Sequence, residues 1–306
     1  MIMRYETLHK YPPIFQKCTG LSVAEFDGLV ADLLPQYVEA EIERLSQRER
    51  QRDIGGGAQY KLELQDHLLL VIVWLRLYPT GVVLGYLFGV SEPTASRTKK
   101  RVLPLLEQAG RDTMRLPQPG QRTRRDLSVL LAMLPELSVI VDSFEQPVQR
   151  PQDPSEQKRY YSGKKKRHTL KSQIAVDAQT GYIVEVSDSV PGPTADITLL
   201  RDSGLLERLP EEMGIGGDLA YLALPGLRAN GFAPRRKPRG KPRPDQDIIY
   251  NRVFAHFRII VEQVIGRLRR FQSLSQPDRH HRLDHSARTT AVAGLVNRHF
   301  MAGGIV

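Results

Sequence analysis

The sequence predicts an α/β protein whose first part is entirely helical. Through the N-terminal part, apolar residues recur at three- and four-residue steps, as in Val23, Phe26 and Leu29, which is the spacing of one face of a helix. From Val139 onward, short runs with strand character stand between turn signals. We predict the order strand, strand, strand, helix, strand, irregular segment, helix for this second part.

Composition favours a polyanionic partner in a reducing compartment. The chain has 306 residues and a formal net charge of +10, a balance typical of proteins that bind nucleic acid or an anionic membrane surface. The longest apolar stretch, Leu68 to Leu75, is too short to span a bilayer, and we expect no membrane partner. A single cysteine, Cys18, excludes an intramolecular disulfide and a zinc ribbon.

The N-terminal region is expected to hold two helices. Ser22 and Glu25 form a capping-box pattern that opens the first helix. Pro35 is expected to end or kink it, because proline cannot donate a helical hydrogen bond. A charge-rich second helix should run from Gln36 to about Arg52, and Gly55 to Gly57 should then break the chain.

The next segment predicts a helix-turn-helix. An apolar helix over 62–78 is closed by Pro79 to Gly81, and a short helix ends before Gly89. Ser91 is a suitable N-cap for a polar, basic helix of the kind that enters a DNA groove. A plain helical hairpin with a solvated basic face is the alternative. The candidate DNA-binding residues of this helix are Thr94, Ser96, Arg97, Lys99, Lys100 and Arg101.

The second part of the chain follows a basic linker and carries the predicted sheet. Turn residues, apolar runs and periodicity define each element. The expected elements are a helix over 127–134, strands over 139–141, 168–177, 182–190 and 215–217, a helix over 195–209, a flexible basic loop over 234–244 and a long helix over 247–271.

Three carboxylates stand in positions suited to metal-ion chemistry. Asp142 closes a run that is apolar on both strand faces, which predicts a central strand, and function gathers at the C-terminal ends of such strands. Asp218 follows two glycines, which permit close approach of a ligand. Divalent ions that cut phosphodiesters are held by acidic oxygens from distant parts of a chain. A turn or cap role is the alternative for either aspartate.

Glu262 is the third acid and lies on the long amphipathic helix. It is about 100° around the helix from Val261, at the border of the apolar stripe. A carboxylate in that position either pairs with Arg258 or Arg269 or binds a cation, and spacing alone does not decide between the two.

Taken together, these motifs resemble bacterial insertion-sequence transposases of the DDE superfamily, of the insertion sequence five branch that is related to the eukaryotic Harbinger transposases. The resemblance extends from about Phe15 to His299. Where family members often have lysine beyond the final acid, this chain has Arg269, which keeps the charge. The segments that carry the resemblance are 87–91 with 94–97, Val141 to Ser143, 161–171, Gly217 and Asp218 with Ala220 and Tyr221, and 251–258 with Glu262 and Gly266.

This resemblance implies an RNase H-like mixed sheet with flanking helices, preceded by the helix-turn-helix region. It implies that Asp142, Asp218 and Glu262 bind two Mg²⁺ or Mn²⁺ ions, one activating water or a DNA 3′-OH and the other stabilising the leaving oxygen. The expected activity is to bind terminal inverted repeats, cleave the element ends and join their 3′ ends to target DNA. A non-catalytic DNA-binding regulator and a metal-dependent endonuclease without strand transfer are the alternatives.

The expected domains are an N-terminal helical region (1–57), a helix-turn-helix domain (58–115), a basic linker (116–126) and the catalytic domain (127–306). We expect double-stranded DNA as partner, a homo-oligomer formed through 21–52, and a prokaryotic, cytoplasmic, nucleoid-associated protein. Basic residues expected to bind phosphates, unless they form only a solubilising surface, are Lys164, Lys165, Lys166, Arg167, His168, Lys171, Arg235, Arg236, Arg258 and Arg269.

Other polar residues are expected to have lesser roles. Asp196 should be a helix N-terminal residue favoured by the dipole, with a supporting role left open. Asp177 should serve the hairpin turn. His280, His281 and His285 are expected to form a solvated, DNA-facing patch and not a metal cluster.

Overall fold

The computed structural model describes residues 3–46, 62–117, 134, 137–279 and 282–302. Most of the predicted linker, the helix over 127–134, the break at 55–57 and two of the three clustered histidines therefore lie outside the described residues. Two compact units are present. Unit 1 comprises Met1–Thr113, Arg270–Leu274 and Thr290–Val306, and unit 2 comprises Met114–Arg269 and Ser275–Thr289. The end of the chain, which the sequence places with the catalytic domain, thus belongs to unit 1.

Unit 1 is helical and is built around one buried helix. All eight residues from Leu68 to Leu75 on α4 are buried, which explains why this segment is apolar on every face. None of the helices in the described parts of the chain is long and apolar enough to cross a membrane. The helices of unit 1 are α1 (Tyr5–Leu8), α2 (Pro12–Thr19), α3 (Val23–Ser46), α4 (Leu64–Leu77), α5 (Gly81–Phe88), α6 (Glu92–Thr113), η3 (Gln272–Leu274) and most of α13 (His285–Met301).

Helix α3 confirms the capping box and corrects the prediction at Pro35. The Ser22 backbone N–H donates to Glu25 Oε2 at 2.6 Å, and the Glu25 N–H donates to Ser22 Oγ at 3.2 Å. The helix nevertheless continues through Pro35 to Ser46. The prediction of two helices was wrong because contacts hold both halves: Phe26 is buried before the proline, and Glu41 pairs with Arg101 of α6 after it, at 3.1 Å.

The helix-turn-helix has the predicted layout. Helix α4 ends at Tyr78 in the left-handed conformation, with φ 52°, and α5 ends at Gly89, with φ 63°. The Thr94 N–H donates to Ser91 Oγ at 3.4 Å, as expected for an N-cap. At Gly85 a side chain would meet the carbonyl of Val90 at 2.7 Å. Helix α5 is therefore closely packed against the turn that leads into α6.

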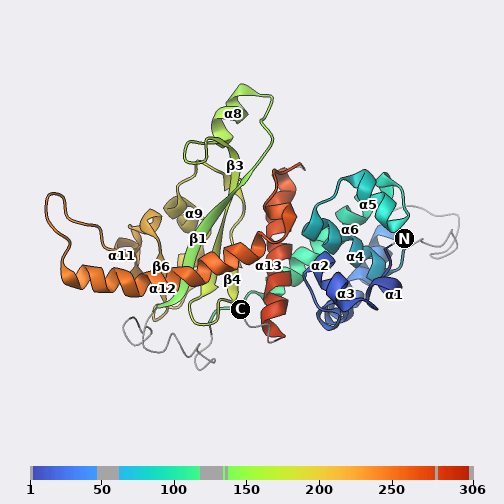
Figure 1. The fold of residues 1–306 in the computed structure, drawn as a ribbon, viewed down its shortest axis with the longest axis horizontal. Coiled ribbons are helices and arrows are strands. Elements are labelled where there is room, and N and C mark those ends of the chain that lie inside the picture. The colour runs from blue at the N-terminus through green and yellow to red at the C-terminus, as the bar shows by residue number, and fades with distance from the viewer. Residues whose placement is uncertain (1–2, 47–61, 118–133, 135–136, 280–281, 303–306) are drawn as a thin grey trace. The chain divides into compact units, whose positions relative to one another are not determined.

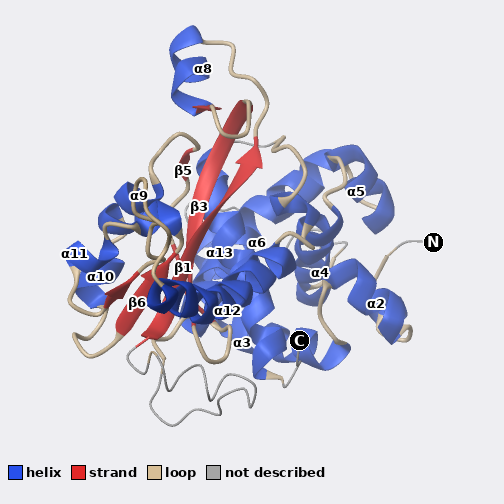
Figure 2. Ribbon diagram, turned by 60° about the vertical axis from the view of Figure 1, so that its left-hand side comes forward, coloured by secondary structure: helices blue, strands red, loops and turns tan. Residues whose placement is uncertain are grey.

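Unit 2 contains a mixed sheet with β1 at its centre (Figures 1 and 2). The strand order is β2-β3-β1-β6-β7, with β4 and β5 also paired to β3. β1 runs antiparallel to β3 and parallel to β6. The strands are β1 (Leu137–Pro147), β2 (Tyr161–Ser162), β3 (Arg167–Asp177), β4 (Ile183–Val186), β5 (Val190–Pro191), β6 (Gly214–Gly217) and β7 (Gly231–Phe232).

Helices cover both faces of this sheet, which is the RNase H-like α/β arrangement expected from the sequence. A side chain at Gly216 would meet Phe254 of α12, and one at Gly217 would meet Tyr221. Successive residues of a strand face opposite sides, so α12 lies on one face and the Tyr221 turn on the other. The helices of unit 2 are α8 (Pro154–Tyr160), α9 (Asp196–Asp202), α10 (Leu205–Arg208), η2 (Leu219–Tyr221), α11 (Leu224–Leu227), α12 (Asp245–Leu268) and η4 (Arg282–Asp284).

Two local predictions for unit 2 need correction, and a third is confirmed. Asp142 does not end its strand, because antiparallel pairing with β3 extends β1 to Pro147. The helix expected over 195–209 is divided into α9 and α10 at Gly204, whose φ is 68°. The hairpin turn itself is confirmed: Asp177 Oδ1 accepts from the N–H groups of Gln179 and Thr180, at 2.7 and 3.1 Å.

The segment that follows α12 is pinned to the sheet by buried polar contacts. His285 is fully buried, so its expected place in a solvated patch was wrong. Its ring nitrogens hydrogen-bond with Gln146 Oε1 at 2.8 Å and Ser189 Oγ at 2.6 Å. Nearby, the buried Arg288 donates to Asp278 at 2.7 Å. Buried polar groups are stable only when their hydrogen-bond partners are in place. These contacts therefore hold the segment around His285 against the end of β1.

The burial of His285 predicts an acid-sensitive fold. Burial lowers its pKa from 6.5 to about 3, so between these values the unfolded chain binds a proton that the folded chain does not. Stability should therefore fall as the pH drops below 6.5, by at most about 1.4 kcal/mol per pH unit from this group. Between pH 7.5 and pH 5.5, the free energy of unfolding measured in urea should fall by roughly 1 kcal/mol less for His285→Gln than for the wild type.

His256→Gln is the matched control, since His256 is exposed on α12. This variant should keep the pH dependence of the wild type. An unchanged pH dependence in His285→Gln would contradict the assignment of the acid sensitivity to the buried imidazole.

Candidate active site and nucleic-acid interface

Strand register brings two of the three candidate acids together. The last parallel pair between β1 and β6 is Val141 with Gly217. Asp142 is the next residue of β1, and Asp218 directly follows the end of β6. Neighbouring strands lie about 4.8 Å apart in a sheet. Both aspartates therefore stand where the parallel ladder ends, the place at which the sequence expected them to meet.

The pKa of Asp142 reflects its burial and the charges around it. Its pKa is raised from 3.8 to about 6, first by burial and then by the charges of Asp218 and Asp196. The Ser143 N–H, which donates to Asp142 Oδ1 at 2.7 Å, and the positive charge of Arg258 lower the same pKa. Burial is thus the main reason why the ionised carboxylate of Asp142 is disfavoured, and the two nearby aspartates add to it. A bound cation would favour the ionised form.

Glu262 lies on α12, the helix that packs against β1. Its side chain is 54% exposed and accepts a hydrogen bond from Arg258 Nη2 at 3.1 Å. Among the residues that the structure describes, no group of three or more His, Cys, Asp or Glu side chains is arranged to hold a metal ion. The structure thus brings Asp142 and Asp218 together and leaves Glu262 in an ion pair, and convergence of all three acids stays a prediction.

The donors that are present fit a hard divalent cation. Carboxylate oxygens are the ligands that Mg²⁺ and Mn²⁺ prefer, and Asp142 and Asp218 supply them from adjacent strands. An exposed ion pair one helical turn apart contributes only about 0.3–0.5 kcal/mol. Loss of the ion pair with Arg258 would therefore cost little free energy if Glu262 bound a cation in its place.

A buried polar network lies behind Asp142, on α9 and β3. Lys171 Nζ donates to Asp196 Oδ1 at 2.7 Å and to the Thr194 carbonyl at 2.6 Å. The Ser143 hydroxyl donates to the same Asp196 oxygen at 2.7 Å. Lys171 was expected to contact phosphate, but its side chain is only 8% exposed. It lies in the buried stretch of β3, and no local sequence signal separates it from the exposed lysines before it.

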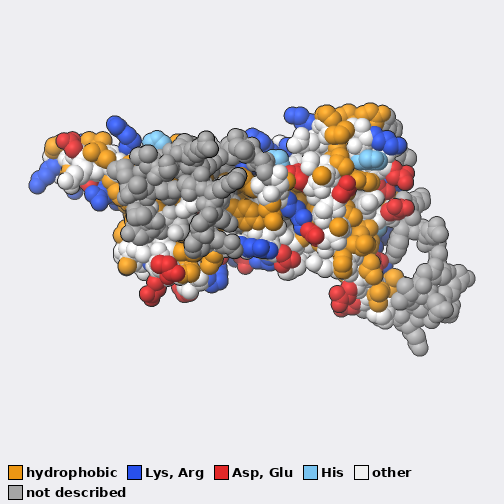
Figure 3. Space-filling model, turned by 90° about the horizontal axis from the view of Figure 1, so that it is seen from below, with side chains coloured by type: hydrophobic (Ala, Val, Ile, Leu, Met, Phe, Trp, Pro, Cys, Tyr) orange, Lys and Arg blue, Asp and Glu red, His pale blue; other side chains and the backbone are white. Residues whose placement is uncertain are grey.

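The exposed basic residues of unit 2 lie near both edges of the sheet. Lys164, Lys165, Lys166 and Arg167 are exposed in the turn between β2 and β3, at one edge (Figure 2), where His168 packs its ring against Tyr161. Beyond β7, at the other edge, Arg236 is exposed and begins the basic loop that precedes α12. Figure 3 shows Lys and Arg side chains at this end of unit 2.

Arg235 is held more firmly than a flexible loop predicts. Its guanidinium stacks on the ring of Tyr250, 4.4 Å from the centroid, and donates to Asp247 at 2.9 Å. Its backbone N–H donates to Asn251 Oδ1, and its carbonyl accepts from Asn251 Nδ2. The loop therefore starts from a fixed position on α12. Arg269, at the C-terminal end of this helix, is exposed.

On the helix-turn-helix, the structure separates exposed from internal candidates. Arg97 and Lys100 are exposed on α6, and Thr94 and Ser96 are half-buried. Lys99 lies over the ring of Trp74, with Nζ 4.6 Å from the centroid. Arg101 is paired with Glu41, as described above. Arg97 and Lys100 are thus the basic residues of this helix best placed to reach DNA.

Comparison with known proteins agrees with the RNase H-like architecture and the helix-turn-helix. Residues 141–297 match the family described as DDE superfamily endonuclease, and residues 60–112 match the helix-turn-helix of DDE superfamily endonuclease. The first match covers more than half of the chain, and the chain therefore belongs to the DDE superfamily of endonucleases. No solved structure gives a significant match.

Two curated relatives are similar over most of their length. The chain is 29% identical over 241 residues to a probable transposase for insertion sequence element IS702 of Microchaete diplosiphon, which covers 79% of this chain and 82% of the relative. It is 27% identical over 286 residues to a putative transposase for insertion sequence element IS112 of Streptomyces albus G, which covers 93% of each.

The division within α6 predicts different effects for neighbouring lysines. Lys100→Ala should weaken binding to DNA and reduce the slope of log affinity against log salt by about 1, because one phosphate contact is lost. Lys99→Ala should lower the melting temperature through the lost contact with Trp74 and leave the salt slope unchanged. Fluorescence anisotropy over a salt series measures both slopes. Equal slopes in the two variants would contradict the assignment.

Proposed function

We propose that this chain is a transposase that binds the terminal inverted repeats of its element, cleaves phosphodiester bonds at the element ends and joins the 3′ ends to target DNA. The observation that carries the proposal is the position of Asp142 and Asp218, each directly after the last residue pair of the β1–β6 ladder. Membership of the DDE superfamily and the presence of a helix-turn-helix support it, as do the two relatives named as transposases.

In this proposal Asp142, Asp218 and Glu262 hold two Mg²⁺ or Mn²⁺ ions. Such ions supply an activated oxygen nucleophile and stabilise the leaving oxygen of an in-line displacement. The protein contributes the two aspartates on adjacent strands and Glu262, which exchanges its bond to Arg258 for a cation. Arg258 then becomes available to grip a phosphate through two N–H groups, as guanidinium groups do.

The exposed basic residues have a positioning role in the same proposal. Arg97 and Lys100 read or hold the element ends from α6. Lys164 to Arg167 and Arg236 to Arg243 neutralise the DNA backbone from the two edges of the sheet, since contacts with phosphate set position and not sequence preference. Arg235 anchors the second of these segments through Tyr250.

One observation favours a second candidate, a DNA-binding regulator without catalysis. Glu262 forms an ion pair with Arg258, and among the described residues it is not grouped with the two aspartates in an arrangement that could hold a metal ion. A regulator would bind DNA with the same affinity in the presence and absence of Mn²⁺ and would cut nothing. A nuclease without strand transfer would cut end DNA but give no joined product from pre-nicked ends.

Asp142→Asn tests the catalytic assignment. The variant should bind end DNA as the wild type does, because α6 is unchanged, while Mn²⁺-dependent nicking should fall by at least about a thousandfold, the order of effect seen when a key catalytic group is removed. A band-shift assay and a nicking assay on the same labelled duplex measure both properties. Asp202→Asn, at an exposed position on α9, is the matched control and should cut normally. Nicking by Asp142→Asn would refute the assignment.

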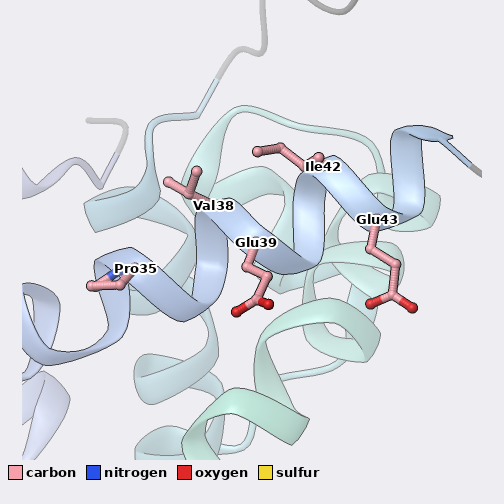
Figure 4. A pocket seen from close by; sticks show the side chains of 5 residues that line it. All are labelled: Pro35, Val38, Glu39, Ile42 and Glu43. Atoms are coloured by element: carbon pink, nitrogen blue, oxygen red, sulfur yellow. The ribbon is translucent and has the colours of Figure 1, made fainter.

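We also propose that the protein forms a homo-oligomer through α3, since two element ends must be held in one assembly. Val38 and Ile42 are 46% and 52% exposed on this helix. With Pro35, Glu39 and Glu43 they line a surface hollow of about 390 Å³ (Figure 4). Val38 and Ile42 lie one helical turn apart, so a second copy of the chain that packs here would bury both.

Ile42→Glu should therefore dissociate the oligomer, because burying a third carboxylate beside Glu39 and Glu43 without a partner is unfavourable. Light scattering coupled to size-exclusion chromatography measures the mass directly. Leu77→Glu, at an apolar residue of α4 that is 42% exposed, serves as the control and should keep the wild-type mass. A monomeric wild type at all concentrations would exclude this proposal.

A further inference from the structure

The network behind Asp142 contains more than a buried ion pair requires. Lys171 and Asp196 are 8% and 13% exposed, so each charge needs its partner. Lys171 also donates to the Thr194 carbonyl, which fixes the ammonium between two acceptors. The pair is therefore satisfied by β3, by α9 and by the turn that precedes α9. The Ser143 hydroxyl, from β1, nevertheless donates to the same Asp196 oxygen at 2.7 Å.

Ser143 connects this pair to the candidate site. Its hydroxyl is held by Asp196, and its backbone N–H donates to Asp142 Oδ1 at 2.7 Å. The side chains of Asp142 and Ser143 lie on opposite faces of the sheet, because side chains alternate along a strand. Ser143 therefore links the carboxylate on one face to Asp196 on the other. Any movement of Ser143 would therefore change the position of the Asp142 carboxylate.

The strand pairing explains why β1 needs an anchor here. Parallel pairing between β1 and β6 ends at Val141, so from Asp142 onward β1 is paired only with β3. Asp142, whose carboxylate must be placed accurately to bind an ion, is thus the first residue of β1 that has lost β6 as a neighbour. The hydrogen bond from Ser143 to Asp196 ties β1 to α9 immediately beyond that point.

We propose that Asp196, held by Lys171, is a positioning residue for Asp142 and acts through Ser143. The inference rests on the proposed function, in which Asp142 binds a divalent ion. It assigns Lys171 an internal role in place of a contact with DNA phosphate. Partners that orient a ligating carboxylate in this way change metal affinity by about 10- to 100-fold.

The test uses Mn²⁺ alone, titrated into the full-length protein without DNA and followed by electron paramagnetic resonance of the free ion. Ser143→Ala removes the link and leaves the Lys171–Asp196 pair intact. Ser143→Thr keeps the hydroxyl. Asp278→Asn breaks a different buried ion pair of unit 2, Asp278 with Arg288, and serves as a control for stability alone. Melting temperatures are measured on the same samples.

Ser143→Ala should bind Mn²⁺ about tenfold more weakly than the wild type, with little change in melting temperature, and Ser143→Thr should restore the affinity. Asp196→Asn should lower both the affinity and the melting temperature. Asp278→Asn should lower only the melting temperature. Wild-type affinity in Ser143→Ala, or an equal loss in the alanine and threonine variants, would overturn the inference.

Asp142→Asn separates this inference from the proposed function. If Asp142→Asn loses Mn²⁺ binding while Ser143→Ala keeps it, the metal site stands and only the positioning role of Asp196 is refuted. If the wild type and Asp142→Asn bind Mn²⁺ equally, the proposed metal site fails, and the positioning role fails with it.

Discussion

The double pairing of β1 is the constraint on which the rest of unit 2 depends. On one side β1 pairs with β3 from Val139 to its end at Pro147, and on the other it pairs with β6 only as far as Val141. The shorter ladder decides where Asp142 and Asp218 meet, and the longer one carries β1 past that point. A shift of either register by one residue would turn an aspartate to the opposite face of the sheet. The candidate site is thus a consequence of strand register.

Charge is distributed around this register in a consistent way. Burial and the neighbouring aspartates raise the pKa of Asp142 to about 6, and they also raise the pKa of Tyr221, for which burial is the largest cause. On the face covered by α9, the charge of Asp196 is compensated by Lys171. On the face covered by α12, Glu262 is paired with the partly exposed Arg258. The buried Lys171–Asp196 pair stabilises the fold. The exposed Arg258–Glu262 pair is weak enough for Glu262 to exchange Arg258 for a cation.

The sequence predicted the elements whose signals are local. The capping box at Ser22, the turn at Gly89 and the hairpin at Asp177 each depend on a few neighbouring residues, and each was found. Predictions failed where tertiary contacts overrode a local preference. Pro35 lies within a continuous helix because packing holds both sides of it, and β1 extends beyond Asp142 because β3 pairs with it. For the candidate site, sequence motifs selected Asp142, Asp218 and Glu262, but only strand register could show that the first two are neighbours. The internal role of Lys171 was missed because its charge resembles that of the exposed lysines before it, and its burial depends on pairing distant in sequence.

The central claim is that strand register creates a divalent-cation site between Asp142 and Asp218, which Glu262 completes. Anomalous diffraction from crystals soaked in Mn²⁺ tests this claim directly. We predict a manganese peak in direct coordination with carboxylate oxygens of both aspartates, with Glu262 turned from Arg258 toward the metal. Manganese bound elsewhere, with Asp142 and Asp218 uncoordinated in a well-ordered sheet, would contradict it.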